Sequence, residues 1–453
     1  MEAKQRSSFT GKIGFVLAAA GSAVGLGNIW RFPYLAAKYG GGVFLLVYII
    51  LSVTFGFSLM VAEIAIGRKT GLSAVSAYKA LDKRFSFVGY LTSAIPTIIL
   101  SYYAVIGGWV LKYIFGYCSG ETVNMATDNY FSGYISQVSQ PLFWFVIFMV
   151  LTAVIVLCGV AKGIERVSKV MMPILVVLIL AISIYTICTM PGALDGVIYY
   201  IKPDFSKFSF MTVIAAMGQL FYSMSLAMGI MITFGSYMKK DISIEKSTRQ
   251  IEFFDTGVAF LSGLMVIPAV FAFSDGDENA LNAGAGLMFE TLPKVFNAMP
   301  GGTIIGLAFF IMVFFAALTS AISLMETVVS IFHDKFKLNR KLCCFIVLGI
   351  ILLLGIPSAL GYSIWSGIEI LGLKFLDFFD FISNSIMMPI VAFVTCILVA
   401  YVVKTKTITD EVELSGKFGR KKLFNVMIKY IAPVFILLIL TFSVLDVFGI
   451  IKI

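Results

Sequence analysis

Apolar residues along this chain come in long blocks, and polar residues gather in the segments between them. A helix needs about 20 consecutive apolar residues to cross a bilayer, whereas buried soluble helices and strands have shorter apolar runs. We therefore predict an all-α polytopic membrane protein with eleven transmembrane helices. They run over 13–37, 42–66, 87–117, 142–159, 168–189, 209–236, 253–273, 302–332, 342–360, 371–402 and 423–447.

The polar segments alternate in charge along the chain. Lysine and arginine cluster before the first block and after each even-numbered block up to the tenth, while the other connections are poorer in base and carry acidic residues. By the positive-inside rule, this pattern predicts a multi-pass protein of the cell membrane with a cytoplasmic N-terminus and an external C-terminus. The same asymmetry accounts for the net charge of +9, so no nucleic-acid partner is expected.

Composition supports a membrane protein and gives no support to an enzyme. Hydrophobic residues make up 59% of the chain and charged residues only 13%. No GxxxxGK[ST] motif is present to drive a nucleotide-dependent pump. The single histidine, His333, excludes a histidine-rich metal site, and the six cysteines form no CxxC pair. No nucleophile–base cluster is apparent.

Two of the predicted spans contain residues that should interrupt a helix. The first has three glycines and an asparagine within 21–28, and the sixth has two serines flanked by glycines within 218–229. Taken alone, the serines of the sixth span could instead back-bond to the preceding turn of an intact helix. However, the two breaks lie five spans apart, and an odd offset makes a second repeat enter the membrane from the opposite face. Interrupted helices at matching places of two inverted halves are typical of a transporter site.

This spacing predicts one transporter domain over 1–453. The first five-helix repeat is expected over 13–189, the inverted second repeat over 209–402, and an extra helix over 423–447. Irregular backbone at membrane depth is tolerated only where it lines a cavity enclosed by protein. Freed carbonyls there bind cations and freed N–H groups bind anions, so we expect an ion and substrate site at the two breaks.

Several ionisable residues fall inside the predicted spans, where the cost of burying a charge indicates a function. They are Arg31, Glu63, Asp255, Glu326, Asp377 and Asp380. Glu63 is expected to cap unpaired N–H groups of a broken helix. Asp255 is either an N-cap at the start of the seventh span or a cation ligand. Arg31 and Asp377 either extend to the membrane surface or form a charge pair that closes the cavity from outside.

The segment GSAVGLGNIWRFPY at 21–34 resembles the first span of the neurotransmitter:sodium symporters, the family typified by the bacterial leucine transporter. Similar motifs occur at 40–44, 63–68, 102–103, 218–226 and 318–320, and at Asp377. The resemblance covers essentially the whole chain. It implies a sodium-coupled secondary active importer, or symporter, of amino acids that works by alternating access.

The resemblance further implies two bound sodium ions. The first would be held by the Ala23 carbonyl with Asn28, Ser223 and Asp255. The second would be held by the carbonyls of Gly21, Val24 and Ala316 with the hydroxyls of Thr319 and Ser320. From the residues alone, two adjacent hydroxyls suit sodium as hard oxygen ligands, but small polar residues also promote helix packing.

A substrate site is implied as well. The substrate carboxylate would meet the N–H groups of Leu26 and Gly27, the hydroxyl of Tyr103 and the first sodium. The ammonium group would meet the carbonyls of Ala23, Tyr222 and Ser223, together with Ser225. Gly25 would leave room for the carboxylate where monoamine transporters carry an Asp.

The expected side-chain pocket carries no formal charge, which favours bulky apolar or aromatic amino acids. Its lining would be Ile99, Tyr103, Tyr222, Ala227, Met228, Ala321 and Leu324. Arg31 and Asp377 resemble an outer gate, and Arg6 and Asp334 with Tyr237 resemble an inner gate. Phe9 stands where the family usually has a tryptophan plug near the N-terminus.

The chain departs from the family pattern beside the first sodium site. Asp255 stands where an Asn is usual, and Ala259 stands where chloride-dependent members help to hold chloride. A permanent carboxylate can supply the negative charge that chloride provides, so transport is expected to be chloride-independent. Two alternatives stay open, namely a proton-coupled transporter with Glu63 or Asp255 as relay, and an amino-acid-binding membrane sensor. The sequence predicts no oligomeric state.

Overall fold

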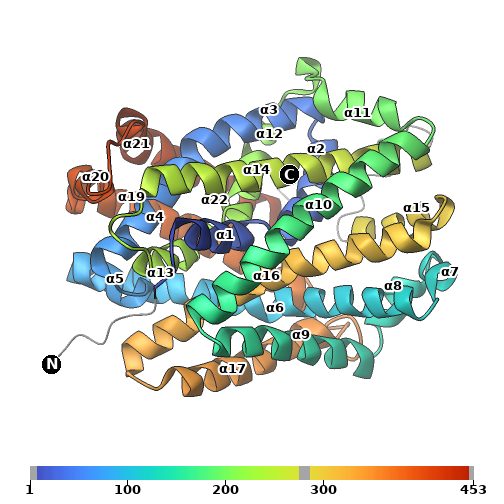
Figure 1. Cartoon of the computed structure of the whole chain (residues 1–453), viewed down its shortest axis with the longest axis horizontal. Coiled ribbons are helices and arrows are strands. Elements are labelled where there is room, and N and C mark those ends of the chain that lie inside the picture. Colours follow the sequence, from blue (N-terminus) through green and yellow to red (C-terminus); the bar gives the residue numbers. More distant parts are fainter. Residues whose placement is uncertain (1–7, 275–285, 448–453) are drawn as a thin grey trace.

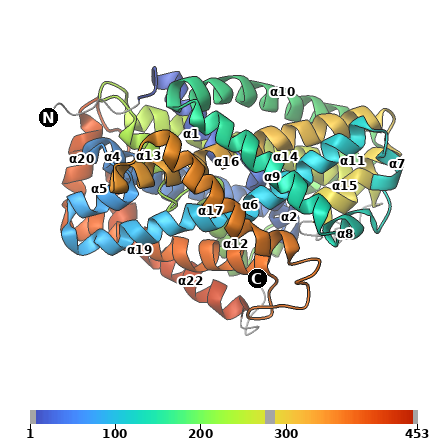
Figure 2. The same ribbon diagram turned by 90° about the horizontal axis from the view of Figure 1, so that it is seen from below.

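The computed structural model describes residues 8–274 and 286–447, and these residues form helices joined by turns, with no β-strand among them (Figure 1). Nine of the described helices are long and apolar enough to cross a membrane, and a bent pair at the start makes a tenth span. The remaining predicted span, the sixth, is present as two short helices, Phe210–Ser223 and Ile230–Ser236. Most of the long helices run along the long axis of the molecule (Figures 1 and 2), and the predicted all-α polytopic fold is confirmed.

The first half of the chain contains α1 Lys12–Ala23, α2 Phe32–Lys38, α3 Gly42–Leu51, α4 Phe57–Thr70, α5 Ala74–Leu81, α6 Ser86–Cys118, α7 Thr122–Met125, α8 Tyr130–Ile135, α9 Ser139–Leu157, α10 Arg166–Thr189 and α11 Ala193–Ile201. The second half contains α12 Phe210–Ser223, α13 Ile230–Ser236, α14 Ile244–Phe273, α15 Leu292–Ala298, α16 Gly302–Phe336, α17 Arg340–Leu360, α18 Phe375–Asp380, α19 Met388–Ile397, α20 Lys404–Glu413, α21 Lys421–Val426 and α22 Ala432–Val447.

The first span is broken where its glycines predict. Helix α1 ends at Ala23, and the next helical segment, Gly27–Lys38, is turned by 54°. The intervening Val24 has an extended backbone with φ −73° and ψ 99°. Because the helix stops inside the bilayer, its last carbonyls and the N–H groups of the following segment are free for other partners.

The sixth span is broken between α12 and α13. A capping box formed by Ser209 and Thr212 starts α12, and the helix ends at Ser223. Beyond it, Ser225, Ala227 and Gly229 all have left-handed backbones, with φ of 53°, 60° and 75°. Such conformations are incompatible with a continuous right-handed helix. The alternative of an intact sixth helix with back-bonded serines is therefore wrong.

Helix boundaries differ from prediction most clearly at the seventh span. Helix α14 starts at Ile244, well before the expected 253. Asp255 thus lies about three turns inside the helix and is fully buried. The N-cap alternative for Asp255 is wrong. The fifth span also starts earlier, because its helical segment runs over Val160–Thr189.

The helices pack around the two breaks. Helix α1 lies against α10, α14 and α16, and α16 packs along α6. Helices α4 and α13 cross so closely that a Cβ added at Gly67 would lie 1.9 Å from the Ile232 carbonyl oxygen, and one at Gly235 would lie 2.4 Å from that of Ile64. Only glycine fits at these two crossing points.

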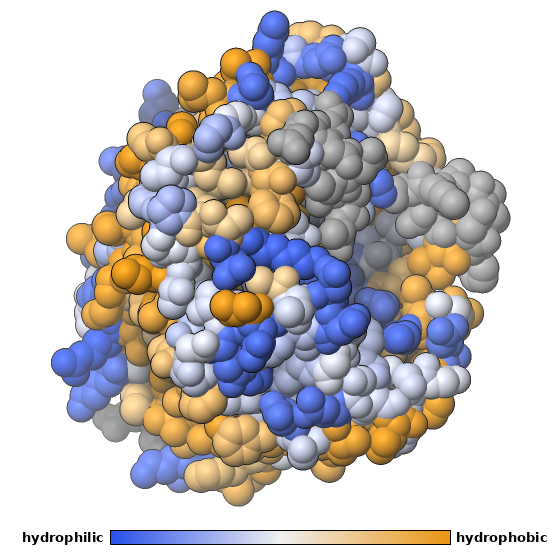
Figure 3. Space-filling view, turned by 90° about the vertical axis from the view of Figure 1, so that its right-hand side faces the viewer, coloured by the Kyte–Doolittle hydropathy of each residue, from blue (hydrophilic) through white to orange (hydrophobic). Residues whose placement is uncertain are grey.

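The surface at one end of the molecule agrees with a membrane-spanning arrangement. Figure 3 looks at the end away from the N-terminus, where hydrophilic residues gather over the middle of the face and hydrophobic residues lie along its edges. Large apolar side chains are also exposed along the flanks of the long helices, for example Val177 of α10 at 63% and Leu353 of α17 at 69%. A polar end and apolar flanks are what a bilayer requires.

Candidate functional site

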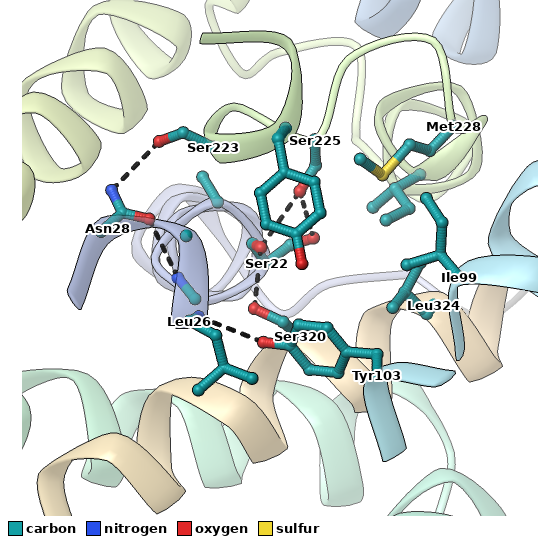
Figure 4. A pocket seen from close by; sticks show the side chains of 15 residues that line it. Ser22, Leu26, Asn28, Ile99, Tyr103, Ser223, Ser225, Met228, Ser320 and Leu324 are labelled. Atoms are coloured by element: carbon teal, nitrogen blue, oxygen red, sulfur yellow. Dashed lines mark hydrogen bonds between the residues drawn. The ribbon is translucent and has the colours of Figure 1, made fainter. Parts of the chain in front are cut away.

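A cavity lies between the two helix breaks, at the middle of the helix bundle (Figure 4). The space between its lining atoms, open solvent included, is about 330 Å³. The lining comes from the first break, from α6, from the second break and its flanks, and from α16. The residues are Ser22, Ala23, Gly25, Leu26, Gly27, Asn28, Ile99, Tyr103, Tyr222, Ser223, Ser225, Met228, Ile230, Ser320 and Leu324.

Most residues predicted for the substrate site line this cavity, with two exceptions. Ala227 and Ala321 are buried but are not among the lining residues. Ser22 and Ile230 line it although the sequence reasoning did not place them there. The lining contains no formally charged side chain.

One wall carries an N–H group and a hydroxyl that face each other. The backbone N–H of Leu26 donates to the Tyr103 hydroxyl at 3.2 Å (Figure 4). On the opposite side, the hydroxyl of Ser225 donates to the Ser22 carbonyl at 3.0 Å, so the two breaks are joined directly. N–H groups at the start of a helical segment favour an anion, and a carboxylate has the size and charge for this position.

A buried carboxylate with three hydrogen-bond donors adjoins the first break. Asp255 accepts hydrogen bonds from the Asn28 amide at 2.7 Å and the Ser223 hydroxyl at 2.6 Å through one oxygen. Its other oxygen accepts from the Tyr48 hydroxyl at 3.2 Å. All four side chains are buried. The structure thus brings Asn28, Ser223 and Asp255 together, and adds Tyr48, which the sequence reasoning did not assign to the first sodium site.

A second group of oxygens lies between the end of α1 and α16. The Ser320 hydroxyl lies 3.4 Å from the carbonyl oxygens of both Gly21 and Val24. The Thr319 hydroxyl lies 3.2 Å from the Ala316 carbonyl oxygen. Ser320 therefore meets the carbonyls of Gly21 and Val24 where α1 unwinds, and a Cβ added at Gly21 would lie 3.3 Å from the Thr319 Cβ. The contact between Thr319 and Ala316 lies within one turn of α16. Three of the five oxygens are carbonyls and two are hydroxyls, which is the donor chemistry that hard cations prefer.

Glu63 of α4 reaches the second break. One of its carboxylate oxygens accepts a hydrogen bond from the Ala227 N–H at 2.6 Å, and the side chain is buried. The prediction that Glu63 caps a free N–H group of a broken helix is confirmed.

The two residues predicted as an outer gate do not meet. The Arg31 guanidinium lies over the Tyr222 ring, 5.4 Å from its centre. Within the part of the chain that the structure describes, it forms no ion pair with Asp377, which is exposed. Asp380, one helical turn later, instead accepts hydrogen bonds from the Tyr102 hydroxyl at 2.9 Å and the Asn384 amide at 2.5 Å.

Aromatic side chains pack together around Phe9, near the N-terminal end of α1. Phe9 is fully buried, and its ring packs edge-on against those of Phe15, Phe234 and Tyr237 at centroid distances of 5.6 to 6.2 Å. The hydroxyl of Tyr237, one of these aromatic residues, donates to the buried Glu326 carboxylate at 2.7 Å.

Of the two charged residues predicted for the inner gate, the structure describes Asp334 only. Asp334 accepts a hydrogen bond from the Ser73 N–H at 2.8 Å. Arg6 lies outside the described residues. Glu326 also pairs with Arg340, a contact that the sequence could not indicate because Arg340 starts the next helix.

Comparison with known proteins gives concordant results. The profile of the sodium:neurotransmitter symporter family matches residues 6–132 and 117–450 of the chain. An uncharacterized sodium-dependent transporter of Bacillus subtilis (strain 168) is 34% identical over 446 residues, which cover 97% of this chain and 98% of the relative. The sodium- and chloride-dependent taurine transporter of Rattus norvegicus is 26% identical, with 90% and 73% covered.

A solved structure is also similar to this chain over nearly the whole length of both. The crystal structure of MhsT in complex with L-phenylalanine has a TM-score of 0.88 and 38% sequence identity to this chain. The match covers 97% of this chain and 100% of MhsT.

Proposed function

We propose that this chain, which belongs to the sodium:neurotransmitter symporter family, imports apolar or aromatic α-amino acids together with sodium by alternating access. It is a multi-pass membrane transporter and not an enzyme. The observation that carries the amino-acid assignment is the pairing of the Leu26 N–H with the Tyr103 hydroxyl beside the cluster around Asp255. These donors and a bound sodium would together neutralise and orient a carboxylate.

The proposed substrate class rests on the open position at Gly25 and the uncharged lining of the cavity. Gly25 keeps the carboxylate position open, since a Cβ there would lie 2.7 Å from the Ser320 hydroxyl and 3.1 Å from that of Tyr103. A charged substrate side chain would be buried without a partner in this uncharged lining. The similarity to MhsT, which was solved with L-phenylalanine, supports an apolar or aromatic side chain.

We further propose two sodium sites per chain. The first is formed by the Ala23 carbonyl, Asn28, Ser223 and Asp255, and the second by the carbonyls of Gly21, Val24 and Ala316 with Thr319 and Ser320. Each sodium entering down 100 mV contributes about 2.3 kcal/mol, and a tenfold concentration ratio adds about 1.4 kcal/mol. Two ions then supply about 7 kcal/mol, enough for a substrate gradient on the order of 10⁵-fold.

For the outer gate we propose that Arg31 pairs with an acid of α18 when the cavity closes. Asp380 suits this role better than the Asp377 expected from sequence. It is held by Tyr102, the neighbour of the cavity residue Tyr103, whereas Asp377 is exposed. For the inner gate, the proposal keeps Asp334 and Tyr237 as predicted, with Arg6 as the expected cation.

Chloride independence is part of the same proposal. In chloride-dependent relatives an anion is expected to sit near the first sodium; here the Asp255 carboxylate already takes the hydrogen bonds of Tyr48 and Ser223. Because those hydroxyls already donate to a carboxylate, they are not free to bind a chloride. The buried Ala259 offers no further donor.

Uptake into proteoliposomes tests the proposal. Radiolabelled leucine, tyrosine, tryptophan and phenylalanine should accumulate when an inward sodium gradient is imposed, and the uptake should vanish when choline replaces sodium. Equal uptake driven by a proton gradient without sodium would establish the proton-coupled alternative instead. Binding without accumulation under any gradient would favour the sensor.

A further inference from the structure

The first turns of α14 carry both acidic and basic residues. Glu245 and Glu252 lie seven residues apart and so share one face of the helix. The Glu245 carboxylate accepts hydrogen bonds from the N–H groups of Gly419 and Arg420 at 2.8 and 3.2 Å, and Glu252 pairs with the Arg420 guanidinium at 3.2 Å. Both acids are therefore engaged by the connection between α20 and α21.

The basic residues of these turns border a cavity. Lys246, Arg249, Gln250 and Phe253 have the spacing of neighbours on one helix face, and with Lys12 of α1 and Phe254 they line a hollow of about 1000 Å³ including its open mouth. None of the three cations has an ion-pair partner within residues 8–274 and 286–447. Arg249 lies three residues before Glu252, whose carboxylate already pairs with Arg420. The three cations around one cavity create a local attraction for an anion.

Apolar side chains stand beside these cations at the surface. Phe253 is 76% exposed, and Ile13, which follows Lys12, is 69% exposed. Large apolar groups next to basic head groups are typical of the boundary between bilayer and water. A small soluble anion would satisfy the cations only, whereas a phospholipid would also cover the aromatic ring with an acyl chain.

We propose that this cavity binds the phosphate-bearing headgroup of an anionic phospholipid. Lys12, Lys246 and Arg249 would bind the phosphate, Gln250 would donate to the headgroup, and Phe253 would contact the acyl chain. Basic pockets between membrane helices bind anionic headgroups in this way. The cavity lies where α1 and α14 begin, the end that the proposed orientation puts at the cytoplasmic leaflet.

Fluorescence quenching by brominated lipids tests the site. In the Phe253→Trp variant, reconstituted in proteoliposomes, brominated phosphatidylglycerol should quench the new indole far more strongly than brominated phosphatidylcholine. The same titration of the wild-type protein corrects for its own tryptophans. Each cation is worth about fivefold in affinity near a membrane surface at low salt, so three give roughly a hundredfold preference.

The charge variants distinguish a built site from general attraction. Replacing Lys12, Lys246 and Arg249 by Gln in the Phe253→Trp background should abolish the preference for phosphatidylglycerol. A control that removes three exposed cations elsewhere, Lys341, Lys417 and Lys422, should keep it. Equal quenching by both lipids, or equal losses in both triple variants, overturns the proposal. Displacement of the brominated lipid by millimolar inorganic phosphate overturns the assignment to a lipid and points to a free phosphate.

Discussion

The carboxylate of Asp255 offers the sharpest test of the proposed coupling. An Asp255→Asn substitution keeps the shape of the side chain and can keep its hydrogen bonds. The Asn oxygen can still accept from Asn28 and Ser223, while its NH₂ group can donate to the Tyr48 oxygen if that hydroxyl rotates. The fold should therefore survive, and the lost property is one negative charge.

The size of the effect follows from this charge. Asp255 is fully buried, so its attraction for a nearby cation is only weakly screened. A unit charge about 4 Å from a sodium ion at an effective dielectric constant of about 20 contributes about 4 kcal/mol. That corresponds to roughly a thousandfold weaker sodium binding. The sodium concentration for half-maximal uptake should rise far beyond the usable range.

Proteoliposome uptake with sodium titrated against choline measures this directly, and replacing chloride by gluconate tests the anion. Wild-type uptake should be unchanged in gluconate. In Asp255→Asn, adding Ala259→Ser should restore uptake in a chloride-dependent form, with Tyr48 as a further donor to the anion. Glu252→Gln removes a charge from the same helix at its surface end and is the matched control, with sodium dependence unaltered. If wild-type uptake collapses in gluconate, Asp255 is not the built-in anion and the first site must be reassigned.

Three further predictions concern the ions, the substrate and the second break. The double substitution Thr319→Ala and Ser320→Ala should raise the sodium requirement for uptake steeply, whereas Ser323→Ala on the same helix should not; unchanged sodium dependence in the double variant would make the two hydroxyls packing groups. Tryptamine should compete with tryptophan uptake far more weakly than tryptophan itself, because it brings no carboxylate to the Leu26 N–H; equal competition would refute the carboxylate site. Glu63→Ala should lower the free energy of unfolding by about 1–3 kcal/mol, since it leaves the buried Ala227 N–H unpaired. Glu63→Gln, which keeps an acceptor oxygen, should lower it less. Thermal unfolding in detergent measures both variants, and an unfolding temperature of Glu63→Ala equal to that of the wild type would contradict the cap.

The sequence predicts the interruptions of the helices better than their ends. Glycine and serine inside an apolar block signal a break because the backbone there must be satisfied by something other than lipid. The start of α14 could not be read in the same way. Its first turns contain Lys246, Arg249 and Glu252, which lower the apolar signal although the helix is regular there. That stretch extends past the apolar core and is held by the α20–α21 connection.

The sequence also could not show which of two neighbouring residues takes part in the site. Asp377 and Asp380 are three residues apart and share one face of α18, so periodicity treats them alike. The difference comes from Tyr102 and Asn384, distant in sequence or on the next turn, which engage only Asp380. Ala227 was likewise expected in the pocket from its motif, but its left-handed backbone, with φ of 60°, places it against Glu63 instead.

The close crossing of α4 and α13 has a mechanical consequence. At Gly67 and Gly235 the two backbones touch with no side chain between them, so no rotamer change can absorb a displacement of one helix relative to the other. The two helices must then move as one rigid unit in any conformational change of the transporter. The bending has to occur at residues 224–229, which join α13 to α12. A Gly235→Ala substitution would separate α4 from α13 rather than make their contact more rigid.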